Sequence, residues 1–170
     1  MFSPFNALAA ALWLYLPAFV ANATPVFVGK IPFLAPLRRP IWEARLGTNK
    51  TWAGLLAGVL MGILVGVLQV TLTSWPYHPV LWIAWSALIS FGALLGDAVK
   101  SYCKRRIGIP PGGAWPVVDG IDYVVGALLV GLPLFVPAWQ VALALLVAGP
   151  VLSLLANVFS YSVGWKKVWY

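Results

Sequence analysis

The sequence predicts an all-α polytopic membrane protein with five transmembrane helices, and its composition and charge pattern both point to this fold class. Hydrophobic residues make up 62% of the 170 residues and charged residues only 9%, against about 45–50% and about 25% in soluble domains. So few charged side chains cannot cover a water-exposed surface, which excludes a soluble globular protein. The charges also gather in three segments that long uncharged stretches separate.

The uncharged stretches 1–29, 51–96 and 123–165 place the expected helices. A transmembrane helix needs about 20 mostly apolar residues, so the first stretch holds one span and each of the others holds two. The expected spans are about 5–28, 53–73, 80–102, 121–136 and 139–163. We expect a tight turn at 74–79 and a break near Pro133 and Pro137, although prolines also kink continuous membrane helices.

The basic residues predict the orientation of these helices. Lys and Arg occur in the connections at about 30–52 and 103–120 and at the C-terminus. Five helices place all three basic segments on one side of the membrane, which the positive-inside rule makes cytoplasmic. We therefore expect residues 1–170 to form a single transmembrane domain in the cell membrane, with the N-terminus outside and the C-terminus cytoplasmic. The net charge of +7 favours anionic partners such as lipid headgroups and nucleotides.

Glycines recur every four residues in the second expected span, at Gly54, Gly58, Gly62 and Gly66. On a helix they form one stripe that allows close approach of another backbone. The stripe is read either as packing against a helix of the same chain or as the seam of a homodimer.

Three of the four carboxylates lie at the expected cytoplasmic ends of helices. Asp97, Lys100, Ser101, Lys104 and Arg105 are spaced so that they share one helix face. Asp119 and Asp122 are three residues apart, on one face at the start of the next helix. Asp97 lies inside the third expected span, where a carboxylate is a functional candidate. The alternative is that it only pairs within its own helix, with Lys100 or Ser101.

Carboxylates that face Lys and Arg suit Mg²⁺ together with phosphate groups. The only histidine, His78, is expected in the turn on the far side of the membrane, so no histidine base serves this cluster. A phosphate monoester that attacks a nucleoside triphosphate needs no such base, because its second pKa is near 6 and positioning with charge neutralisation suffices.

Two further polar sites lie near the same face. Lys50 and Thr51 open the second expected span, where backbone N–H groups and a lysine suit an anion; a capping threonine beside a snorkelling lysine is the alternative. Asn22 lies inside the first span, and by itself it is also explained as interhelical hydrogen bonding.

The runs 96–105 (GDAVKSYCKR) and 110–122 (PPGGAWPVVDGID) resemble the signature of the membrane cytidylyltransferases that make CDP-linked lipids. The CDP-diacylglycerol synthases of that group carry a similar Ser-x-x-Lys-Arg segment and Asp-x-x-Asp ending, but they are longer and have His-Gly-Gly before the final aspartates. This chain has no histidine there. This chain is instead similar to the archaeal branch, the CDP-archaeol synthases. The similarity rests on the missing histidine, on the short chain, and on the runs 15–22 (YLPAFVAN) and 50–54 (KTWAG).

The resemblance implies transfer of CMP from CTP to 2,3-bis-(O-geranylgeranyl)-sn-glycerol 1-phosphate, with Mg²⁺ as cofactor and pyrophosphate as the second product. It implies a site on the cytoplasmic side, with CTP, the lipid phosphate and the bilayer as partners, no nucleic acid, and a homodimer left open. Asp97, Asp119 and Asp122 would hold Mg²⁺. The triphosphate and the lipid phosphate would be neutralised by Lys50, Lys100, Lys104 and Arg105. Hydrogen bonds would come from Asn22, Thr51 and Ser101.

Three alternatives remain at this point. A diacyl phosphatidic acid differs from the ether lipid by carbonyl groups that the sequence does not reveal. A non-catalytic scaffold or a small transporter would be of another class, but transporter sites usually lie near the bilayer midplane.

We also expect a groove that opens sideways to the bilayer, with walls thinned by Gly54, Gly58, Gly92 and Gly96.

Overall fold

The computed structural model describes residues 3–29, 31–73, 78–110, 113–115 and 117–164, and within them it confirms the all-α class. No strand occurs in these ranges, where an isolated bridge joins Pro40 to Thr51. The helices are α1 (Pro4–Leu14), α2 (Leu16–Val28), the 3₁₀ helix η1 (Pro32–Leu37), α3 (Glu43–Leu46), α4 (Trp52–Leu72), α5 (Pro79–Arg106), α6 (Val118–Gly131) and α7 (Trp139–Ser162).

Three helices, α4, α5 and α7, are each long and apolar enough to cross a membrane, and α1 with α2 makes a fourth candidate span that is bent by 54°. The predicted break near Pro133 and Pro137 is confirmed, because α6 ends at Gly131 and α7 begins at Trp139. The 14 residues of α6 extend about 21 Å, less than the roughly 30 Å hydrocarbon core. The count of five spans therefore stays a prediction. Most of the predicted turn at 74–79 lies outside the described residues.

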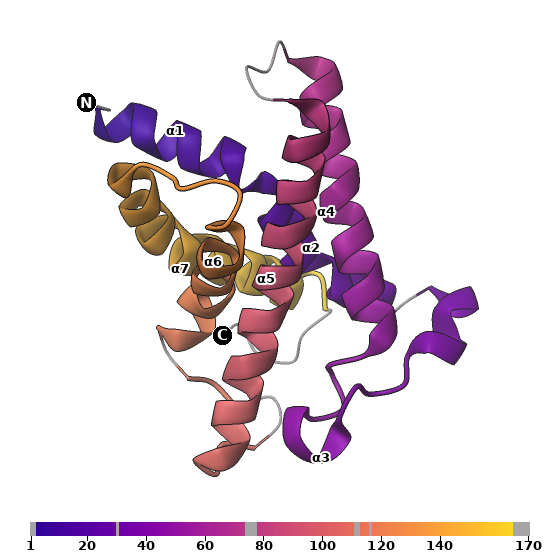
Figure 1. Ribbon diagram of the computed structural model, residues 1–170. Coiled ribbons are helices and arrows are strands. Elements are labelled where there is room, and N and C mark those ends of the chain that lie inside the picture. The colour runs from indigo at the N-terminus through magenta and orange to yellow at the C-terminus, as the bar shows by residue number, and fades with distance from the viewer. Residues whose placement is uncertain (1–2, 30, 74–77, 111–112, 116, 165–170) are drawn as a thin grey trace.

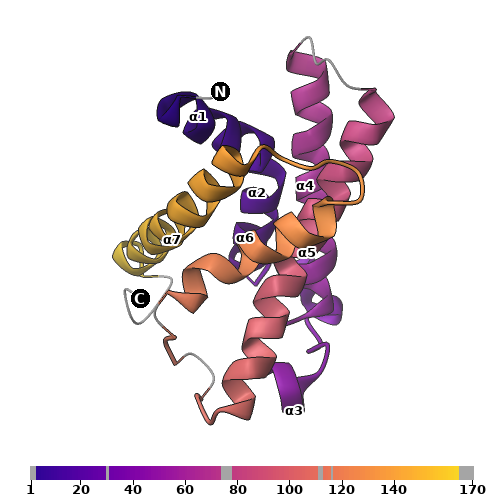
Figure 2. The ribbon, with the colours of Figure 1, turned by 60° about the vertical axis from the view of Figure 1, so that its left-hand side comes forward.

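Helix α5 is the centre of the arrangement, because α2, α4 and α6 all pack against it. Figure 1 shows α4 and α5 side by side along the length of the molecule, and Figure 2 shows α6 crossing α5 and leading to α7. Helix α7 then packs on α6 and α1. This order brings the end of α5 and the start of α6 together.

The first predicted span, 5–28, differs from the expected single helix because it bends at Tyr15. Pro17 has no N–H to donate to the carbonyl of Trp13, so the helical hydrogen-bond ladder is interrupted there. The buried side chain of Gln69 in α4 supplies the missing donor, with its Nε2 2.6 Å from Trp13 O. The same amide accepts a hydrogen bond from Trp82 Nε1 at 3.2 Å, which ties the bend to α4 and α5.

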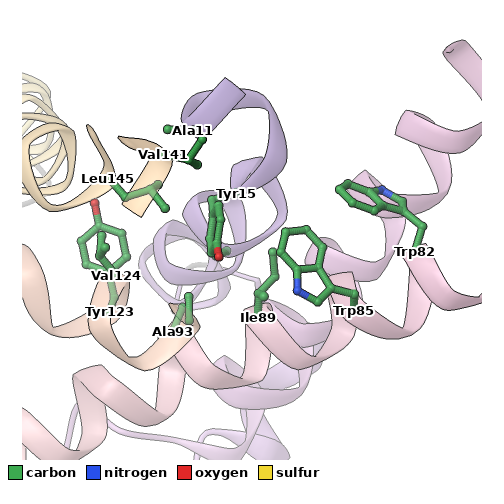
Figure 3. Packing of buried hydrophobic residues seen from close by; sticks show 12 residues of the cluster. Ala11, Tyr15, Trp82, Trp85, Ile89, Ala93, Tyr123, Val124, Val141 and Leu145 are labelled. Carbon is green, nitrogen blue, oxygen red and sulfur yellow. The ribbon is translucent and has the colours of Figure 1, made fainter. Parts of the chain in front are cut away.

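Aromatic rings and small residues fill the core around this bend (Figure 3). The rings of Tyr15 and Trp85 meet edge to face with centroids 5.2 Å apart, an arrangement that aromatic pairs favour. Ile89 and Leu145 are fully buried beside them, so α2, α5 and α7 share one core.

The glycine stripe of α4 packs within the chain, as the first interpretation holds. A Cβ on Gly58 would lie 2.8 Å from Ala21 O in α2, and a Cβ on Gly62 would lie 1.9 Å from the Ser90 hydroxyl in α5. Hydrogen at these positions lets three helices approach more closely than any side chain would permit. Because the stripe is fully used inside the chain, the interpretation of it as a homodimer seam is wrong.

Candidate active site

The predicted face of α5 is confirmed as the centre of a charged cluster. Asp97, Lys100 and Lys104 stand on successive turns of the helix, and Lys50 at the start of α4 forms an ion pair with Asp97. Lys100 Nζ lies 2.9 Å from Asp97 Oδ1. The pairing of Asp97 with Lys100 within the helix is therefore present, but it is one part of a larger network.

Lys100 connects all three predicted aspartates. Besides Asp97, its Nζ lies 2.8 Å from Asp122 Oδ2 and 3.3 Å from Asp119 Oδ1. Only 5% of the Asp122 side chain is exposed, and 13% of that of Lys100. Charges this far from water persist when they are paired, so the three carboxylates and the lysine depend on one another.

Asp119 is the most fully satisfied of the three carboxylates. Lys104 Nζ donates to its two oxygens at 3.0 and 3.1 Å, and the backbone N–H of Trp115 donates to Oδ2 at 2.6 Å. Burial by itself raises the pKa of Asp119, but the Trp115 amide, Lys104 and Lys100 together outweigh it, and hold that pKa below its usual value. Asp119 is therefore an anion at neutral pH.

A strained turn precedes Asp119. Val117 has a φ of 69°, in a region that β-branched residues rarely enter. The backbone N–H of Asp119 donates to Trp115 O at 3.0 Å, while the Asp119 carboxylate accepts from the Trp115 N–H. These reciprocal hydrogen bonds offset the strain and fix where the carboxylate points.

Close helix contacts bring the two halves of the cluster together. A Cβ on Gly96 of α5 would lie 2.2 Å from Asp122 O, and a Cβ on Gly126 of α6 would lie 2.2 Å from Gly92 O. Only glycine permits this separation of the two backbones. Without it, Asp122 could not reach Lys100 from the neighbouring helix.

Helix α7 supports the start of α6 from the other side. Tyr123 donates its hydroxyl hydrogen to Gly149 O at 3.0 Å, and Ser153 Oγ lies 3.3 Å from Asp119 O. Trp115, Tyr123 and Ser153 were not predicted from the sequence as supports of the cluster. The missing signal was the pairing of α6 with α7, which helical spacing does not encode.

Three predicted site residues, Thr51, Ser101 and Arg105, make contacts of a structural kind. Thr51 caps α4, with its Oγ1 accepting from Gly54 N at 3.1 Å, as the alternative interpretation holds. Ser101 donates to Asp97 O at 2.8 Å, which still leaves its oxygen free to accept. Arg105 donates to Ile109 O in the following loop. Asn22 lies half-buried in α2, and among the described residues no hydrogen bond or ion pair joins it to the cluster.

The donor set of the cluster fits a hard divalent cation, because carboxylate oxygens are the ligands that Mg²⁺ takes. Both oxygens of Asp122 are buried, and neither receives a well-directed hydrogen bond from a described residue. Lys100 approaches Oδ2 as an ion pair only. Among the residues that the structure describes, no three His, Cys, Asp or Glu side chains are grouped closely enough to hold an ion. The ammonium of Lys100 lies among the carboxylates instead.

The expected glycine-walled groove is not found at the predicted positions. Gly54 meets Pro25, and Gly58 meets Ala21 and Leu94. Gly92 and Gly96 meet the backbone of α6. All four lie against atoms of a neighbouring helix, so a leucine at Gly58 or Gly92 would disrupt packing rather than block a lipid. The prediction that these four glycines line a groove is therefore wrong.

Comparison with known proteins matches almost the whole chain. Residues 5–170 match a family model described as CarS-like, CDP-archaeol synthase. The CDP-archaeol synthase of Thermococcus gammatolerans is 40% identical over 167 residues, which cover 93% of this chain and 94% of the relative. That of Methanococcus aeolicus is 32% identical over 166 residues, covering 91% and 92%.

A solved structure supports the same relationship. It is described as an intramembrane enzyme for archaeal membrane lipid biosynthesis and matches with a TM-score of 0.73 and 36% identity, over 89% of this chain and 94% of the other. At 36% identity the two chains share sequence as well as the arrangement of their helices.

Proposed function

This chain belongs to the CDP-archaeol synthase family, and from that premise we propose that the cluster around Lys100 is where CTP and a lipid phosphate react. The reaction is transfer of CMP from CTP to 2,3-bis-(O-geranylgeranyl)-sn-glycerol 1-phosphate, with release of pyrophosphate. The observation that supports this site best is the contact of one largely buried lysine with aspartates from two helices.

A phosphate oxygen of the lipid attacks the α-phosphorus of CTP. A new P–O bond forms as the bond from the α-phosphorus to the oxygen bridging to the β-phosphate breaks, and pyrophosphate leaves with that electron pair. The attacking phosphate monoester has a second pKa near 6, so it is mostly dianionic at neutral pH and needs no general base. The residues of the cluster therefore act by positioning and by charge neutralisation.

The lysines supply part of the positive charge that two phosphate-bearing substrates require. Lys50, Lys100 and Lys104 are each held in place by an aspartate, so their ammonium groups are ordered before the substrates arrive. A phosphate that enters competes for these ammonium groups and gains charge-assisted hydrogen bonds. Arg105, now bound to Ile109 O, would contribute only after releasing that carbonyl.

Asp97, Asp119 and Asp122 would hold Mg²⁺, with Asp122 contributing buried oxygens that have no well-directed donor among the described residues. Bound Mg²⁺ supplies Lewis-acid polarisation of the phosphoryl oxygens and neutralises charge on the leaving pyrophosphate. Among the described residues these carboxylates are not grouped closely enough to hold an ion as they lie, and Lys100 stands between them. Holding the metal would therefore require Lys100 to shift toward the phosphates and the carboxylates to approach one another.

We place this cluster on the cytoplasmic side of five spans, with the N-terminus outside. The ion pair of Lys50 with Asp97 supports this orientation, because it puts the basic segment 30–52 at the same end of the molecule as the basic end of α5. The end of α4 and the start of α5 lie at the opposite end (Figure 1). CTP is soluble and would reach the cluster from the cytoplasm. The short helix α6 would span together with the turn that follows it.

The test is incorporation of α-labelled CTP into lipid by the purified protein in vesicles with Mg²⁺. The geranylgeranyl ether phosphate and a diacyl phosphatidic acid are compared at equal mole fraction. Label should enter the ether lipid and be lost in Lys100→Met, whereas Arg39→Ala, on an exposed arginine outside the cluster, should resemble the unchanged protein. Equal use of both lipids would contradict the assignment of the ether substrate. Full activity of Lys100→Met would contradict the assignment of the site.

A further inference from the structure

A hollow of roughly 250 Å³ lies between α3 and the C-terminal half of α5. Its lining is apolar and aromatic: Trp42, Leu46, Leu95, Ala98, Val99 and Tyr102. The volume is slightly below that of pockets for whole drug-sized ligands, and it suits one segment of a hydrocarbon chain. Water is a poor occupant, because an ordered water needs two to four polar partners.

The hollow and the reaction site are on different faces of α5. The lining positions 95, 98, 99 and 102 repeat every three or four residues and form one stripe. Asp97, Lys100 and Lys104 form another stripe, which faces α4 and α6. At about 100° per residue the two stripes point in nearly opposite directions. A lipid in the hollow is therefore not the lipid whose phosphate reacts.

Two arginines mark the rim of the hollow. The guanidinium carbon of Arg45 lies 5.8 Å from the ring centroid of Trp42, and that of Arg106 lies 5.7 Å from the ring centroid of Tyr102. Both rings line the hollow, so cation–π contacts hold a positive charge beside each. Neither arginine forms an ion pair with any residue that the structure describes, and both are exposed. Glu43 is the one acidic residue of α3, and it is also exposed.

We propose that this hollow is a binding site for an anionic phospholipid of the surrounding bilayer, separate from the site of CMP transfer. One hydrocarbon chain occupies the hollow, and the headgroup phosphate is bound by Arg45 and Arg106. Aromatic residues beside arginines at the end of a helix are typical of the level at which headgroups lie. The bound lipid would fill the space between α3 and α5 and hold the two elements together.

The experiment measures lipid retention by native mass spectrometry. The full chain is taken from vesicles of equal parts dioleoyl phosphatidylglycerol and dioleoyl phosphatidylcholine, and the lipids that remain bound are counted. The unchanged protein should retain one phosphatidylglycerol in preference to phosphatidylcholine. The double variant Arg45→Ala,Arg106→Ala should lose that preference about tenfold, and Ala98→Leu, which fills the hollow, should lower retention of both lipids.

Two control variants match these changes. Arg39→Ala removes an exposed arginine outside the hollow, and Leu60→Phe enlarges an exposed apolar side chain on α4; both should retain phosphatidylglycerol as the unchanged protein does. The replaced arginine side chains lie on the surface, so these variants should still fold and should be monodisperse in gel filtration.

Equal retention of phosphatidylglycerol by the double arginine variant would overturn the proposal. This outcome is independent of whether the cluster around Lys100 performs the reaction.

Discussion

Lys100 Nζ and Asp122 Oδ2 lie 2.8 Å apart, although the lysine belongs to α5 and the aspartate to α6. The pair is buried, and it exists because glycines at the crossing of α5 and α6 let the two backbones almost touch. The chemistry of the cluster thus depends on the packing of two helices.

Asp122→Asn should lower kcat at least about 100-fold, the loss typical of removing one preorganised charge from a reaction site. Asparagine keeps the shape of the side chain but removes the charge that Lys100 and a metal ion require. Label transfer from CTP to lipid measures the loss, while detergent extraction and gel filtration check that the variant is still folded. Near-normal turnover in Asp119→Asn,Asp122→Asn would refute the role of this pair in holding metal.

Gly96→Ala should lower both stability and activity, because the new Cβ would lie 2.2 Å from Asp122 O. Overpacking of this kind costs about 1–3 kcal/mol, and the forced separation would pull Asp122 away from Lys100. Thermal melting in detergent and turnover in vesicles measure the two effects. Gly29→Ala is the matched control, since its nearest contact would be 3.7 Å away, and it should change neither.

Removing divalent metal with EDTA should abolish label transfer, and Mg²⁺ should restore it. The physical reason is that the lysines of the cluster are already paired with aspartates, so they cannot by themselves neutralise a triphosphate. Binding of Mg²⁺ in the presence of CTP should also raise the melting temperature of the unchanged protein by mass action, and should do so less in Asp122→Asn. Unchanged turnover in EDTA would exclude the proposed cofactor.

His78→Ala should leave turnover unchanged. His78 is exposed at the start of α5, and at 1.5 Å per residue the helix places it about 28 Å from Asp97. The same label-transfer assay is the measurement, with Lys100→Met as the inactive reference. A loss of more than about tenfold would mean that this end of α5 takes part in the reaction and that the proposed topology is wrong.

The charged face of α5 and its aspartate partners on α6 could be predicted from the sequence, because helical periodicity determines which residues of one helix share a face. It did not reveal which helices pack together, and that limit explains the errors. Gly92 and Gly96 were expected at an open groove, yet they lie against the backbone of α6. Arg105 shares the right face by spacing, but the loop carbonyl of Ile109 takes its guanidinium. The bend at Tyr15 depends on a proline and on Gln69, far away in the sequence.

The contact of α1 with α7 has a consequence for how the protein is made. Ala11 near the N-terminus and Val141 and Leu145 of α7 belong to the same buried cluster (Figure 3). Helix α1 therefore lacks this packing partner until α7 has been synthesised and inserted. Until then α1 must rest on lipid or on the insertion machinery, and a chain truncated before α7 would be left permanently open. Closure of this part of the core therefore waits for α7, the last of the described helices.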